Sequence, residues 1–228
     1  MHKIVLEISL ALLMAAAAPA WSGEDVAPQA LVKAATAEVV SILRHDKDIQ
    51  AGVAPKLAEV VETRIVPLFN FTRMTQLAVA RNWRVATPAQ QKLLTGEFQT
   101  LLVRTYSTAL SNYRDQVIEF KPVRAAPADT EVTVKSVVKQ PGMDALSMDY
   151  EMEKTAAGWK VYDIKIDGIS LITTYRETFA NKVRADGVDG LIKALSDKNR
   201  QGDARVRAHQ TENSHFPALV RFLLQGGT

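Results

Sequence analysis

The hydrophobic pattern of this chain changes its period close to residue 117, and this change most constrains the fold class. Before it, apolar residues recur every three or four positions, which places them on one face of an α-helix. After it, apolar and polar residues alternate, as in strands with one buried and one solvent-exposed face. Helices followed by a block of strands indicate an α+β protein and not an alternating βαβ fold.

Caps and prolines mark the helix boundaries. Asn70 can cap a short helix, and Thr87-Pro88-Ala89-Gln90 combines a Thr cap, a proline at the first helical position and a Gln three residues after the cap. Gly187 lies where the C-terminal cap of a later helix is expected. We therefore expect helices from Pro28 to about His45, from about Pro55 to Pro67, shortly after Asn70, from Pro88 to about Tyr113, and over residues 170–185 and 188–199.

Four strand-like segments follow the first block of helices. They cover Val117–Arg124, Thr130–Val138, Ala145–Lys154 and Trp159–Asp167. The turns between them are short, which indicates an antiparallel meander. We expect a four-stranded antiparallel sheet with helices packed on one face, as one α+β domain over residues 21–199.

Both ends of the chain differ from this central domain. Residues 1–20 combine a positive start, an apolar run and the small-x-small pattern Ala18-Pro19-Ala20, so we expect a signal peptide cleaved near Ala20. The apolar run is too short to span a bilayer. Residues 200–228 are expected to be a loose extension with a short amphipathic helix near its end.

The composition argues against several kinds of chemistry. The chain has no cysteine, and its four histidines lie at residue 2, at the end of the first expected helix and in the C-terminal extension. We therefore expect no catalytic triad, no metal site and no cofactor. Much of the net charge of +3 comes from arginines after residue 199, so the charge of the chain does not indicate a nucleic-acid-binding surface.

An enzyme remains an alternative at this stage. A cone-shaped α+β domain can act with one buried aspartate and one tyrosine. Asp163 or Asp167 could serve with a tyrosine here, although ion pairs and core packing also explain these residues. The candidate tyrosines are Tyr106, Tyr162 and Tyr175.

Several segments together resemble the MlaC family of periplasmic phospholipid carriers, also called toluene-tolerance proteins. The resemblance covers about residues 30–199, and two departures are the pair Arg81-Asn82 and the extension after Asn199. The segments are Pro67-Leu-Phe-Asn-Phe-Thr-Arg-Met74, Asn82-Trp-Arg-Val-Ala-Thr-Pro88, Leu101-Leu-Val-Arg-Thr-Tyr106, Gly158-Trp-Lys-Val-Tyr-Asp-Ile-Lys-Ile-Asp-Gly-Ile-Ser-Leu171 and Tyr175-Arg176.

This resemblance implies an NTF2-like cone around a deep apolar cavity. It implies a periplasmic, monomeric, non-enzymatic protein whose cargo is phospholipid. It also implies shuttling between an outer-membrane lipoprotein complex and an inner-membrane ABC transporter complex, which maintains the lipid asymmetry of the outer membrane. A small NTF2-like isomerase or hydrolase and a periplasmic chaperone or adaptor remain alternatives on the same cone.

A carrier of this kind needs an apolar lining, and we select candidates from the inward faces of the expected elements. For any one of them, ordinary core packing is the more common explanation. Arg104 and Arg176 could contact a headgroup phosphate or form structural ion pairs, with Asp163 or Asp167 as possible partners of Arg104. The candidate lipid-binding residues are Phe69, Met74, Phe98, Leu102, Tyr106, Val134, Leu146, Met148, Tyr150, Ile164 and Ile166.

Overall fold

The computed structural model describes residues 27–50, 54–111, 113, 116–123, 125–126 and 128–209. The expected signal peptide and the expected helix near the end of the C-terminal extension lie outside the described residues. None of the described helices is long and apolar enough to cross a membrane.

The strands form one antiparallel sheet in the order β1-β2-β3-β4-β5. The expected count of four was wrong, because a fifth strand of two residues follows a tight turn in which Asp167 and Gly168 both have positive φ. So short a strand shows no periodic pattern. The strands are β1 Val117–Phe120, β2 Glu131–Lys139, β3 Leu146–Thr155, β4 Gly158–Ile166 and β5 Ile169–Ser170.

Two expected caps start helices as predicted. The Asn70 side chain accepts from the Arg73 amide at 3.0 Å. The Gln90 amide donates to Thr87 Oγ1 at 3.2 Å, and Thr87 N donates to Gln90 Oε1 at 2.9 Å. The helices are α1 Pro28–His45, α2 Lys47–Gln50, α3 Ala54–Val60, the π-helix η1 Val61–Ile65, the 3₁₀ helices η2 Val66–Leu68 and η3 Ala80–Arg84, α4 Phe71–Val79, α5 Pro88–Ser111 and α6 Thr173–His209.

Several stretches of helix differ from expectation, and the short helices α2 and η3 were not expected at all. The second expected helix is divided into α3, η1 and η2, because Pro67 cannot donate a hydrogen bond and ends the regular pattern. The two final helices run together as α6, with a break at Gly187, where φ is 71°. Residues 200–209 continue α6, whereas we expected a loose segment from residue 200.

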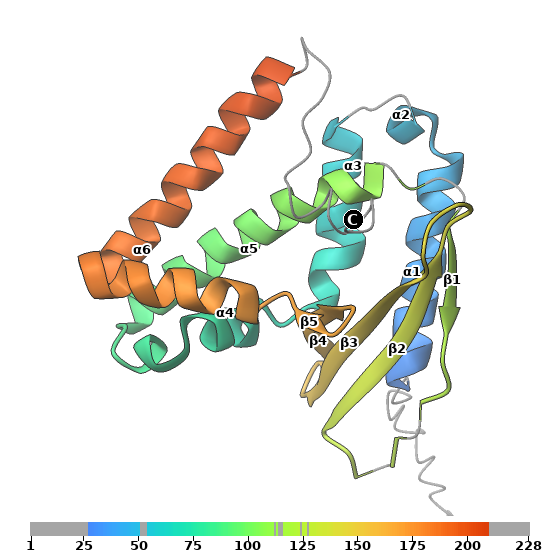
Figure 1. Ribbon diagram of the computed structural model, residues 1–228, viewed down its shortest axis with the longest axis horizontal. Coiled ribbons are helices and arrows are strands. Elements are labelled where there is room, and N and C mark those ends of the chain that lie inside the picture. Colours follow the sequence, from blue (N-terminus) through green and yellow to red (C-terminus); the bar gives the residue numbers. More distant parts are fainter. Residues whose placement is uncertain are drawn as a thin grey trace, which may run out of the picture.

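The helices divide into two groups around the sheet (Figure 1). Helix α1 lies against one face of the sheet, where Val32 joins Val134 and Met152 in a buried cluster. Helices α4, α5 and α6 form a separate helical core next to the sheet. The helical core meets the sheet where the Asn70 amide donates to the Val161 carbonyl at 2.9 Å, which covers the free edge of β4.

Candidate functional site

The inner face of the sheet, which is the face that α1 covers, carries a mostly apolar surface. The strand register places Tyr150 between Val134 and Ile164, and Met148 between Ser136 and Ile166. On the opposite face, Glu151 bonds Lys165 at 2.7 Å and Asp149 bonds Lys135 at 3.5 Å. The expected alternation along β3, with apolar side chains inward and carboxylates outward, is confirmed.

Burial along this inner face is uneven. Val134 and Met152 are fully buried. Leu146, Met148 and Ile166 are only half-buried, and among the described residues they belong to none of the buried hydrophobic clusters. We call these three residues the open strip. Half-buried apolar side chains on a sheet face can receive an apolar ligand without displacing packed core.

A second group of candidates lies inside the helical core. Phe98 is fully buried, with its ring centre 5.1 Å from Tyr175 and 5.2 Å from Phe179 on α6. Met74 and Leu102 are buried in the same cluster. These three residues pack against other helices and are not brought to the sheet face, so their contact with lipid stays a prediction.

Two candidates lie at the borders of these groups. Phe69 packs against both the helical core and the sheet cluster. Tyr106 packs against the helical core, and within the described residues its buried hydroxyl oxygen has no hydrogen-bond partner. Burial raises the pKa of the Tyr106 hydroxyl, and the neighbouring Tyr175 raises it further. This phenol therefore stays protonated at neutral pH.

Arg104 connects α5 to α6. Its guanidinium donates to the Asn199 carbonyl, and the buried Asn199 amide donates to the Glu97 side chain at 2.7 Å. Both aspartates considered as partners of Arg104 accept from other groups. Asp163 accepts from Ser170 Oγ at 2.5 Å, and Asp167 accepts from the Ser147 amide at 2.8 Å.

Among the described residues, neither Asp163 nor Asp167 is hydrogen-bonded to any of the three tyrosines considered for an enzyme. Asp163 is held by Ser170 and by the Ile172 amide, and Tyr106 neighbours Tyr175 instead. The Tyr162 ring lies beneath Arg73. In the part of the chain that the structure describes, no group of three or more His, Cys, Asp or Glu side chains is placed to hold a metal ion.

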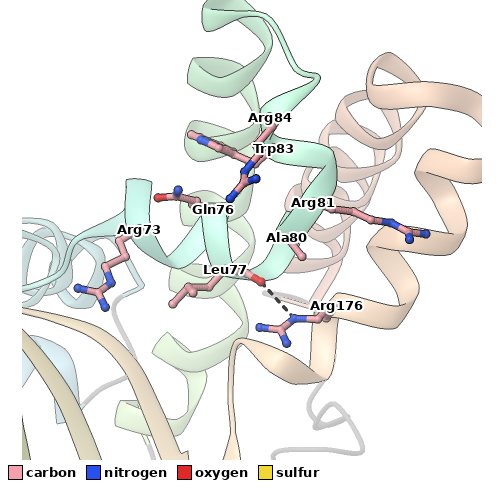
Figure 2. Close-up of a pocket in the computed structure, with 8 residues that line it drawn as sticks. All are labelled: Arg73, Gln76, Leu77, Ala80, Arg81, Trp83, Arg84 and Arg176. Carbon is pink, nitrogen blue, oxygen red and sulfur yellow. Dashed lines mark hydrogen bonds between the residues drawn. The ribbon is translucent and has the colours of Figure 1, made fainter.

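Arg176 lies on α6 and not on the sheet face that carries the open strip. Its Nε donates to the Leu77 carbonyl at 3.2 Å, and the side chain is exposed (Figure 2). It lines a surface hollow of about 620 Å³ together with Arg73, Arg81 and Arg84. Sequence reasoning missed Arg84 and noted Arg81 only as a departure from the family pattern.

Comparison with known proteins identifies the family. The MlaC protein family model matches residues 33–197. The chain is 22% identical to the toluene tolerance protein ttg2D of Pseudomonas putida over 179 residues, which are 78% of this chain and 83% of that protein. It is 18% identical over 180 residues to the intermembrane phospholipid transport system binding protein MlaC of Haemophilus influenzae, covering 78% of this chain and 84% of that protein.

A solved structure agrees in fold. It is the phospholipid-binding protein from Ralstonia solanacearum in complex with a phospholipid, which is 42% identical to this chain, with a TM-score of 0.71. The match covers 77% of this chain and 98% of that one. The predicted α+β class is confirmed, and the chain belongs to the MlaC family.

Proposed function

We propose that this chain is a periplasmic phospholipid carrier and not an enzyme. The observation that carries the proposal is the similar Ralstonia solanacearum protein, which holds a phospholipid in its structure. The sheet of this chain offers apolar surface of the required kind, since the open strip is half-buried and lies beside the covered part of the same face.

The energetics of a phospholipid explain why a carrier must enclose its cargo. Two acyl chains of about sixteen carbons would cost on the order of 25 kcal/mol to expose to water, at ~0.8 kcal/mol per CH₂. The chains therefore need an apolar enclosure, while the polar headgroup can stay in water. We place the acyl chains against Leu146, Met148 and Ile166, with Tyr150 and Ile164 continuing the surface toward α1.

The place of action and the partners form part of the same proposal. Family membership supports exchange of lipid with an outer-membrane lipoprotein complex and an inner-membrane ABC transporter complex. The export pattern around Ala20 supports the periplasm. N-terminal sequencing of the exported protein should start close to Trp21, and recovery of the full-length chain in the membrane fraction would contradict export with cleavage.

Solvent extraction of the purified, exported protein followed by mass spectrometry tests the cargo. The carrier should release phospholipids in a fixed ratio to protein. Lipid-free protein with turnover of a small substrate would favour the isomerase or hydrolase alternative. Bound unfolded polypeptide would favour the chaperone alternative.

A further inference from the structure

A basic hollow lies on the surface of the helical core, apart from the open strip. Its volume is about 620 Å³, and none of the described residues that line it carries a carboxylate. Figure 2 shows that these side chains come from α4, η3 and α6. The lining residues are Arg73, Gln76, Leu77, Ala80, Arg81, Trp83, Arg84 and Arg176.

Among the described residues, acidic side chains neutralise only one of the four arginines. Arg73 bonds Glu131 at 2.6 Å and Glu153 at 2.5 Å. Within the described residues, no carboxylate pairs with Arg81, Arg84 or Arg176. Three exposed guanidinium groups around one hollow therefore carry uncompensated positive charge.

The positions of these charges favour an extended anionic surface over a single small anion. In Figure 2 the Arg84 side chain lies beside Trp83, whereas Arg81 extends toward α6 and Arg176 lies below Leu77. The guanidinium groups thus surround the hollow and do not converge on one point. A small anion would be held by donors that converge on it.

Apolar side chains accompany these charges. Trp83 lines the hollow, and Val85, directly after Arg84, has 73% of its surface exposed. Arginine together with tryptophan and exposed aliphatic side chains suits the boundary between lipid headgroups and acyl chains.

From this combination, we propose that the hollow is a docking site for a membrane surface that contains anionic phospholipid. Arg81, Arg84 and Arg176 bind headgroup phosphates, while Trp83 and Val85 contact the boundary region. The inference goes beyond the carrier function and does not depend on it, because no residue of the open strip lines the hollow. Docking would hold the protein at a bilayer by electrostatic attraction that salt weakens.

Vesicle co-sedimentation of the purified, exported protein tests this site. Binding is measured on phosphatidylcholine vesicles and on vesicles that contain phosphatidylglycerol, at low and at high salt. We expect binding to the phosphatidylglycerol vesicles only, and weaker binding at high salt. The double variant Arg81→Gln/Arg84→Gln should bind more weakly by about fivefold per arginine, on the order of 25-fold in all. Adding Arg176→Gln should weaken binding by about fivefold more.

The matched control is Lys33→Gln/Lys47→Gln, which removes the same charge from exposed positions on α1 and α2. This control should bind almost as the wild type does. Circular dichroism verifies that each variant is folded. Extraction and mass spectrometry on the arginine double variant should find the wild-type phospholipid content, which keeps a failure of docking distinct from a failure of the carrier function.

Two results would overturn the proposal. The first is that the wild type binds neither kind of vesicle; binding to polyglutamate in that case would indicate an acidic protein partner. The second is that the arginine and lysine variants lose binding equally, which would indicate an effect of net charge alone.

Discussion

The guanidinium carbon of Arg73 lies 3.7 Å from the centre of the Tyr162 ring, so that the first turn of α4 is stacked on β4. The same guanidinium bonds Glu131 on β2 and Glu153 on β3. Asn70, the cap of α4, also donates to Glu153 at 2.7 Å. One arginine therefore joins the helical core to three strands of the sheet.

Replacing this arginine should loosen the junction. Arg73→Ala removes the stacking and leaves Glu153, whose side chain is only 16% exposed, with fewer donors. We expect a loss of about 1–3 kcal/mol in unfolding free energy, measured by urea denaturation. The control Arg64→Ala breaks an exposed pair with Glu38 and should cost about 0.5 kcal/mol or less. Equal losses in both variants would mean that the Arg73 contacts are ordinary surface interactions.

Two glycines offer a test of backbone conformation without a change in packing. A Cβ added at Gly187 or at Gly96 would meet no atom within 4 Å, but only Gly187 has a positive φ, of 71°. Gly187→Ala should destabilise the protein by about 1–2 kcal/mol. Gly96→Ala, within α5, should stabilise it by about 0.5–1 kcal/mol. Thermal unfolding of both variants measures the two shifts, and a neutral Gly187→Ala would show that the break in α6 is not fixed by this residue.

Asp163 should make the stability of the protein depend on pH. Burial raises the pKa of its carboxyl, although hydrogen bonds from Ser170 and from the Ile172 amide oppose the rise. Between the unfolded pKa, about 4, and the raised folded pKa, the folded state binds more protons, so this residue's contribution to stability falls as pH rises.

Asp163→Asn removes this titration. As pH rises from the unfolded pKa of the aspartate to its raised folded pKa, the stability of the wild type relative to the variant should decline. Above the folded pKa, the difference should stay constant. Denaturation at a series of pH values measures the difference. A constant difference across the window, or one that grows in favour of the wild type, would contradict the raised pKa.

Local signals in the sequence were sufficient for most element boundaries. The caps at Asn70 and Thr87 and the left-handed Gly187 act through neighbouring residues, so they can be read without knowledge of the fold. The two-residue strand β5 is too short to show a periodic pattern, and the π-helical turn η1 before Pro67 has no local sequence signal.

The candidate site was less predictable, because an inward face does not reveal what it meets. Phe98 and Met148 both lie on such faces, yet Phe98 packs against α6 while Met148 remains half-buried on the sheet. The basic hollow was missed for another reason. Arg81 and Arg176 are far apart in the sequence, and only the packing of η3 near α6 brings them to one surface.

Two methionines on one strand provide the sharpest test of the proposed lipid site. Met148 and Met152 lie on the same face of β3, separated by Tyr150. Met152 is fully buried in the cluster beneath α1, whereas Met148 belongs to the open strip. A large aromatic side chain should therefore have opposite effects at the two positions.

Met148→Trp should fill space that an acyl chain would occupy without straining packed core. We expect a folded, exported protein with a melting temperature close to that of the wild type and with most of its phospholipid lost. Met152→Trp, the matched control, should overpack the cluster at a cost of about 1–3 kcal/mol. Melting temperature and the ratio of phospholipid to protein are measured on the same samples. A destabilised Met148→Trp that keeps its phospholipid would mean that Met148 is ordinary core. A stable Met148→Trp with full lipid content would mean that the acyl chains lie elsewhere.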